Sequence, residues 1–202
     1  MDKRQEAQEL LAKQKTKEKR TKLLTISVIA AAALAILIPT AVVLTGAAQE
    51  KSDMAAAAQA PIKGVQHYEV ASSEHVGTKV TYPQKPGIGG DHNAVWLNCG
   101  IYDQPVPENN AVHSLEHGAV WVSYDGISDA EKTTLTRDIG EKTYMLMSPY
   151  PEQGAKIKLT AWGEQLSVDS VDDPRIDVFV KKYRQGPQTP EPGAPCTGGL
   201  SG

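Results

Sequence analysis

The feature that most constrains this chain is a long uncharged apolar segment near its N-terminus. No Asp, Glu, Lys or Arg occurs between Lys22 and Glu50. The stretch from Leu23 to Gly46 is long enough, as a helix, to cross a hydrocarbon layer of about 30 Å. It predicts a single transmembrane helix over residues 23–46, through which the chain binds the lipid bilayer. A cleaved signal peptide is the alternative, since small residues follow the segment, but the apolar core of a signal peptide is usually shorter, at about 7 to 15 residues.

Basic residues are concentrated before this segment. Residues 1–22 hold eight Lys or Arg and four acidic residues, whereas residues 23–202 hold thirteen and twenty. By the positive-inside rule, residues 1–22 form a basic cytoplasmic tail. After a tether at residues 47–61, an extracytoplasmic domain spans residues 62–202, so we expect a protein of the cell membrane. The acidic domain lacks a basic surface for phosphate backbones, which argues against nucleic acid as a partner.

The two cysteines, Cys99 and Cys196, fit an oxidising compartment. Thiols outside the cytoplasm tend to be paired. We expect one disulfide that ties the Pro- and Gly-rich C-terminal segment to the middle of the domain. Closing a loop of nearly a hundred residues stabilises a fold by about 4 kcal/mol in the chain-entropy model. Two free thiols are the alternative.

The sequence pattern of the domain predicts both strands and helices. β-branched and aromatic residues favour strands, which are expected at residues 94–100, 119–124, 143–150 and 155–162. Ser128, followed by acidic residues in the first turn, caps a helix that runs to about Glu141. A last helix opens at Pro174. The order β-α-β-β-α predicts an α+β fold, with a small, mostly antiparallel sheet backed by two helices.

The sharpest signal for chemistry is a pair of histidines four residues apart. On one helical turn, His113 and His117 lie on the same face, close enough to share a metal ion. His92 follows a glycine-containing loop and is expected to join them. His67 and His75 lie near the edge of the domain and are left out of the predicted ligand set.

The residues around this pair indicate which metal would bind. Met147 alternates with Met145 onto one face of its strand, and thioether with imidazole favours copper, particularly Cu(I). Imidazole with a carboxylate, from Glu116 or Asp91, favours zinc. For copper or, alternatively, zinc, the predicted ligands are His113, His117, His92, Met147 and Glu116.

Two alternatives to a metal-binding role stay open. In the first, the histidines form a hydrogen-bonded polar cluster in an interaction or assembly module for a membrane-protein partner, with Met147 as core filler. In the second, the chain is a metal-dependent hydrolase, because His113 to His117 match H-x-x-E-H, with Glu116 as general base. Gly118 and a strand follow directly, so the pair lies at the end of a short turn and not in the long helix that such a site needs. We therefore expect a non-enzymatic domain without catalytic residues.

Several motifs resemble the bacterial domain of unknown function 3105 family. They are GDHNAVWLNCGIYDQPVPENNAVHSLEHGAVWVSY, MSPYP, LTAWG and GPQTPEPGAPCTGG, and they extend from about Lys79 to Gly199. The resemblance implies anchored or exported proteins that share this module, with no activity attached to it. The methionines match less firmly, which favours a His-based site over a dedicated copper site. The motif positions in this chain are His92, Cys99, Tyr102, His113, Glu116, His117, Gly118, Ser148, Pro149, Tyr150, Trp162 and Cys196.

Overall fold

The computed structural model describes Lys19, Lys22 and residues 61–202. The chain divides into two units, Met1–Ala55 and Ala56–Gly202, and every element named here belongs to the second. The segment predicted to cross a membrane, residues 23–46, lies outside the described residues. Among the residues that are described, no helix has both the length and the apolar character that a membrane crossing requires. The elements in chain order are β1 (Gln66–His67), β2 (Gly100–Ile101), α2 (Glu108–Glu116), β3 (Val120–Tyr124), α3 (Asp129–Gly140), β4 (Met145–Pro149), β5 (Ile157–Ala161), β6 (Glu164–Val168) and α4 (Arg175–Tyr183).

The six strands form one mixed sheet, in the order β1-β6-β5-β3-β4-β2. β4 pairs parallel with both β3 and β2, while the β3–β5, β5–β6 and β6–β1 pairs are antiparallel. The prediction of a mostly antiparallel sheet is therefore wrong. The reason lies in the connection between β3 and β4, because α3 is long enough to carry the chain back to the end of the sheet where β3 started.

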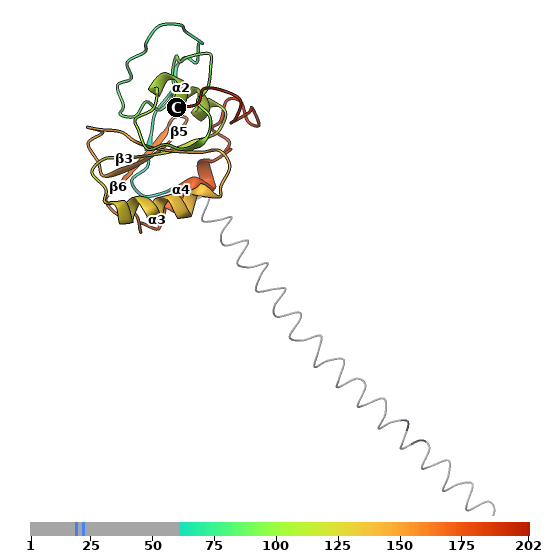
Figure 1. The fold of residues 1–202 in the computed structure, drawn as a ribbon. Coiled ribbons are helices and arrows are strands. Elements are labelled where there is room, and N and C mark those ends of the chain that lie inside the picture. Colours follow the sequence, from blue (N-terminus) through green and yellow to red (C-terminus); the bar gives the residue numbers. More distant parts are fainter. Residues whose placement is uncertain (1–18, 20–21, 23–60) are drawn as a thin grey trace, which may run out of the picture. The chain divides into compact units, whose positions relative to one another are not determined.

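Helices cover both faces of this sheet (Figure 1). α3 and α4 lie on one face and α2 lies on the other. Because successive strand residues point to opposite faces, each face has its own core. Val120 and Val122 of β3 belong to the core under α3 and α4, whereas Trp121 belongs to the core under α2. The α+β class is confirmed, with three helices within residues 61–202 in place of the two expected.

α3 begins where the sequence predicts. The side chain of Ser128 accepts a hydrogen bond from the Glu131 N–H, and the Glu131 carboxylate accepts one from the Ser128 N–H. This reciprocal capping box satisfies two backbone donors that the first helical turn would otherwise leave free. Local sequence was therefore sufficient to locate this end of the helix.

Three strand assignments differ from the prediction, and one of them is the two-residue strand β1, which was not expected. Of residues 94–100, only Gly100 belongs to a strand, because backbone groups in this segment bond elsewhere: the Cys99 N–H donates to the Cys196 carbonyl at 2.7 Å. β6 was not expected. It follows β5 through a tight connection at Gly163, whose φ of +70° is a conformation that glycine adopts without strain.

Candidate metal centre

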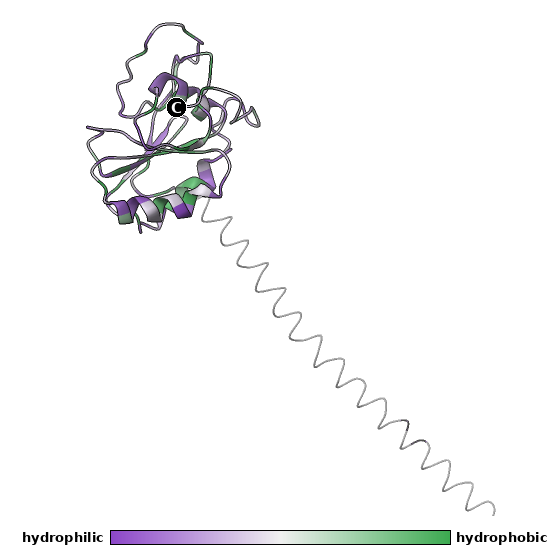
Figure 2. Ribbon diagram, in the orientation of Figure 1, coloured by the Kyte–Doolittle hydropathy of each residue, from purple (hydrophilic) through white to green (hydrophobic). Residues whose placement is uncertain are grey.

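α2 is a polar helix that is nevertheless buried. Figure 2 shows it mostly in the hydrophilic colour, yet every residue from Ala111 to Glu116 is buried. Buried polar side chains need partners, which makes such a helix informative. The helix ends at Glu116, since Gly118 adopts a φ of +94° and donates its N–H to the Leu115 carbonyl. The expected short turn is thus the end of a nine-residue helix.

The two histidines at this helix end face each other, as their spacing predicts. The Nε2 atoms of His113 and His117 are 2.9 Å apart, and each residue is only 3% exposed. Trp96 packs against both imidazoles, with ring centroids 5.8 Å from His113 and 5.1 Å from His117. The indole therefore shields one side of the pair from solvent.

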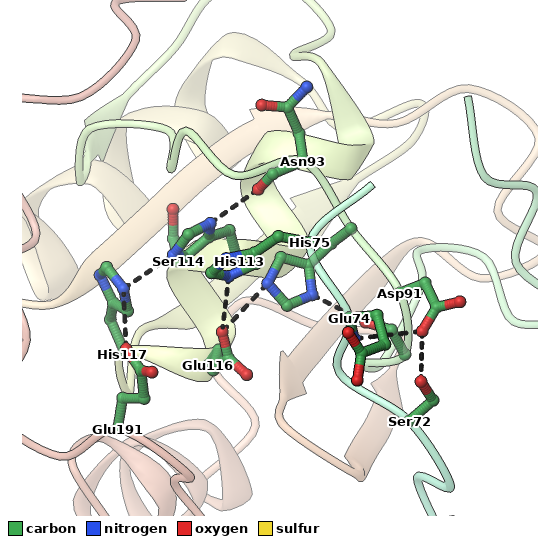
Figure 3. Close-up of polar contacts among 12 residues, drawn as sticks. Ser72, Glu74, His75, Asp91, Asn93, His113, Ser114, Glu116, His117 and Glu191 are labelled. Carbon is green, nitrogen blue, oxygen red and sulfur yellow. Dashed lines mark hydrogen bonds and ion pairs between the residues drawn. The ribbon is translucent and has the colours of Figure 1, made fainter. Parts of the chain in front are cut away.

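Two more histidines reach the same place from the segments before α2. His75 and His92 form a short parallel bridge, in which the Val76 N–H donates to the His92 carbonyl at 2.8 Å. The bridge places the His75 ring in a stack on His113, with centroids 4.6 Å apart. His92 is completely buried, and its ring lies 4.7 Å from that of His113. Histidines from separate parts of the chain therefore meet at one point (Figure 3).

The carboxylate of Glu116 lies among these rings. Its Oε2 atom is 3.0 Å from Nε2 of His92 and 3.6 Å from Nε2 of His75. The His92 Nε2 and Glu116 Oε2 atoms are both buried, and although they are close they are not aligned as a hydrogen bond. A buried carboxylate oxygen without such a bond costs free energy unless a positive charge compensates for it.

The buried histidines all use Nδ1 in the same way. A backbone carbonyl only accepts hydrogen bonds, so an Nδ1 atom that contacts one carries a proton and donates it. In a neutral imidazole, Nε2 is then left with its lone pair, which is the arrangement typical of metal-binding histidines. The three Nδ1 atoms donate at 2.7 Å: His92 to Gly90, His113 to Asn93 and His117 to Pro195.

Burial opposes protonation of the central histidine. Burial and, to a smaller extent, the neighbouring imidazoles lower the pKa of His113 to about 4, although the hydrogen bond to the Asn93 carbonyl acts in the opposite direction. His113 is therefore neutral at pH 7. A metal ion needs a deprotonated imidazole nitrogen as its ligand, so His113 is in the form that binds.

Four of these side chains, here called the His/Glu group, could hold a metal ion. One ligand atom from each of His75, His92, His113 and Glu116 lies within 4.8 Å of the others. Ligand atoms at 2.0–2.2 Å from a zinc ion are separated from one another by roughly 3–3.5 Å. Small side-chain rotations would therefore bring all four atoms to one ion.

The structure brings together only part of the predicted ligand set. His92, His113 and Glu116 belong to the His/Glu group, and His117 adjoins it through His113 without being one of the four. Met147 does not reach the histidines. The pleat of β4 turns it to the opposite core, where it is completely buried and its sulfur accepts a hydrogen bond from Thr136 of α3 at 3.9 Å.

Two residues of this region were not in the predicted ligand set. His75 stands in a short polar segment without periodicity, and nothing local indicates that this segment pairs with His92. Glu191 lies in the Pro-rich C-terminal segment, yet its Oε2 atom is 3.5 Å from Nε2 of His117. Asp91, the other carboxylate considered for zinc, instead accepts hydrogen bonds from the Ser72 hydroxyl and the Glu74 N–H.

Cys99 and Cys196 lie at disulfide distance, as expected. Their Cα atoms are 5.3 Å apart, although 97 positions separate them in sequence, and native disulfides show such Cα separations. The pair holds the C-terminal segment close to the end of α2, where the Glu191 N–H donates to the Glu116 carbonyl at 3.1 Å. This segment therefore forms part of the surroundings of the histidines.

Residues 74–198 match a protein family whose description is "Protein of unknown function (DUF3105)". The match covers more than half of the chain, starts slightly before the motifs noted in the sequence, and includes the whole His/Glu group together with His117 and Glu191. No curated protein and no solved structure matches this chain. The resemblance seen in the motifs is confirmed, and the chain belongs to the DUF3105 family of proteins of unknown function.

Proposed function

We propose that this domain binds a divalent transition-metal ion through His75, His92, His113 and Glu116. The observation that carries the proposal is the orientation of the buried imidazoles. His92 and His113 donate Nδ1–H to backbone carbonyls, which leaves their Nε2 lone pairs free to bind a metal ion. Nε2 of His92 lies 3.0 Å from the buried carboxylate of Glu116, and His113 belongs to the same group. Three imidazoles and one carboxylate supply four ligands without a thiolate or a thioether.

This ligand set favours zinc. Nitrogen ligands with one carboxylate oxygen suit Zn²⁺, and they also suit Cu²⁺. The argument for Cu(I) rested on the thioether of Met147, which belongs to the opposite core. Structural zinc sites use four protein ligands, whereas catalytic sites leave one position to water or substrate. For a single bound ion, four protein ligands therefore support a binding role over a hydrolytic one, with Glu116 as ligand instead of general base.

Metal analysis of the full-length chain, purified in a mild detergent, tests the proposal. Tight binding to the folded state raises stability, by about 2.7 kcal/mol at a free zinc concentration of 100 Kd. We expect zinc to raise the melting temperature of the EDTA-treated protein, and His75→Ala to reduce that increase. His67→Ala is the matched control, because the side chain of His67 is 70% exposed and contacts Glu164 outside the group. Absence of bound zinc or copper, with unchanged melting, would overturn the proposal.

A structural role for the same histidines is the second candidate. It is supported by the hydrogen bond from His117 to the Pro195 carbonyl and by the one from the Glu191 N–H to the Glu116 carbonyl, which tie the C-terminal segment to α2. In this role, the domain serves as an interaction or assembly module for a membrane-protein partner. Substitution of His113 would then lower stability equally with EDTA and with zinc, whereas a metal role makes the loss larger with zinc.

We also propose that residues 23–46 anchor the chain in a membrane, with residues 62–202 outside the cytoplasm. The uncharged segment and the basic residues before it support this orientation, and so does the pairing of the two cysteines. Single cysteines introduced as Gln5→Cys and Ser52→Cys test it in intact cells with a membrane-impermeant maleimide. We expect labelling at position 52 and protection at position 5 until lysis. The reverse pattern would refute the orientation, and a mature chain that begins after Gly46 would show cleavage.

A further inference from the structure

A second carboxylate lies beside the histidine that the His/Glu group leaves out. Nε2 of His117 is 2.9 Å from Nε2 of His113 and 3.5 Å from Oε2 of Glu191. Figure 3 shows Glu191 next to His117 on one side of His113, and His75 on the other side. The ligand atoms therefore separate into two sets of three, each with two imidazole nitrogens and one carboxylate oxygen.

The two sets have the same composition, but Glu116 is the member that contacts the other two in the first set, and His117 is that member in the second. In the first, Oε2 of Glu116 is 3.0 Å from His92 and 3.6 Å from His75. In each set one member is exposed, since the side chains of His75 and Glu191 are 44% and 53% exposed, and the other two members are buried. Solvent thus reaches each set through a different residue.

Glu191 is held in place by its surroundings. Its N–H donates to the Glu116 carbonyl at 3.1 Å, and the nearby Gly193 N–H donates to Oε1 of Gln185 at 3.0 Å. The carbonyl of Pro195 accepts the Nδ1 proton of His117 at 2.7 Å. The segment that carries Glu191 therefore contacts both the end of α2, at Glu116, and the ring of His117.

The contact between His113 and His117 brings two ring nitrogens together. Both rings donate Nδ1–H to carbonyls, so in their neutral forms two Nε2 lone pairs face each other at 2.9 Å. Two nitrogens at about 2.1 Å from one tetrahedral zinc ion are roughly 3.4 Å apart. The observed separation of 2.9 Å is therefore within about 0.5 Å of the separation in a site where one ion binds both nitrogens.

We infer that the cluster binds two divalent transition-metal ions, one held by His75, His92 and Glu116 and the other by His113, His117 and Glu191. This inference rests on the proposed metal-binding function and extends it. One Nε2 lone pair serves a single ion, so His113 completes the first site when one ion is present and joins the second site when two are bound. Two imidazoles with one carboxylate form a ligand set for Zn²⁺, Fe²⁺ or Cu²⁺.

Zinc stoichiometry in the full-length chain tests the inference. The EDTA-treated protein is titrated with Zn²⁺, separated from free metal and analysed for zinc per chain. We expect two zinc ions for the unmodified chain and one for Glu191→Gln, with the affinity of the second site reduced at least tenfold. Glu191→Gln keeps the shape of an exposed side chain and so leaves folding intact. Glu141→Gln, an exposed residue at the end of α3, is the matched control and is expected to retain two.

The outcomes separate the two proposals. One zinc ion in the unmodified chain overturns the second site and leaves the first standing. No zinc overturns both. Two zinc ions in Glu191→Gln overturn the assignment of Glu191. His75→Ala provides the reciprocal measurement, since it is expected to weaken the first site and to leave binding by His113, His117 and Glu191.

Discussion

Replacing Glu116 by glutamine should have opposite effects on stability without and with metal. The side chain of Glu116 is 4% exposed, and its Oε2 atom has no aligned hydrogen bond. Glutamine has the same shape, carries no charge, and can donate an amide N–H to the Nε2 lone pair of His92, 3.0 Å away. The substitution therefore removes a buried charge and adds a hydrogen bond.

The magnitudes follow from these contacts. Relief of an unsatisfied buried acceptor is worth about 1–3 kcal/mol, so metal-free Glu116→Gln should be more stable than the parent by that amount. With zinc at 100 Kd, the parent gains about 2.7 kcal/mol. Loss of a ligand should weaken binding by at least the roughly 100-fold seen for residues that only support metal ligands. The variant then gains only about 0.4 kcal/mol from the same zinc.

Thermal unfolding followed by circular dichroism, with EDTA and with zinc, measures both effects. A change of 1 kcal/mol corresponds to roughly 2–4 °C in melting temperature for chains of about this size. Glu116→Gln should melt above the parent in EDTA and show almost no increase with zinc. Glu141→Gln should behave as the parent in both conditions. A Glu116→Gln variant that melts lower in EDTA and keeps the full zinc-induced increase would refute the reasoning.

Four further outcomes are expected. Without added metal, the chain should lose stability as pH falls from about 6.5 toward 4, because the lowered pKa of His113 lets the unfolded state bind a proton that the folded state does not. Urea unfolding at pH 7 and 4.5 should show a loss about 2.4 kcal/mol larger than in His113→Gln, and equal losses would contradict it. Cys99→Ser combined with Cys196→Ser should lower the free energy of unfolding by about 4 kcal/mol in guanidinium titrations, and an unchanged midpoint would exclude the disulfide contribution. Met147→Leu should cost less than about 1.5 kcal/mol and leave zinc content unchanged, whereas loss of zinc would make Met147 a ligand. Ser128→Ala should cost about 1 kcal/mol through loss of the helix cap, with the zinc-induced increase in melting temperature retained.

Features of the fold that depend on neighbouring residues could be predicted from sequence. The capping box at Ser128 and the alternation of Ile157, Leu159 and Ala161 along β5 are both local, and both appear in the structure. The directions of strand pairs are not local. β4 pairs parallel with β3 because a helix joins them. The predicted order of elements included this helix, but the prediction of a mostly antiparallel sheet did not take it into account.

The candidate site shows the same difference between local and non-local features. The pairing of His113 with His117 follows from a spacing of four residues, so sequence was sufficient to predict it. His75 joins the group through a backbone bridge to His92, a contact that no periodicity indicates. The alternation that put Met147 and Met145 on one face was right, but both faces of the sheet are buried, and the pattern alone did not show which one lies near the histidines.

The parallel bridge and the C-terminal segment place the outermost members of the cluster, His75 and Glu191, more than a hundred residues apart in sequence. A chain that is still being synthesised, or one that has not folded, presents only the local pair at the end of α2. Metal occupancy would thus report that folding is complete. Release of the ions would in turn be limited by the rate at which the domain opens, so a chelator added to the loaded protein would measure that opening rate.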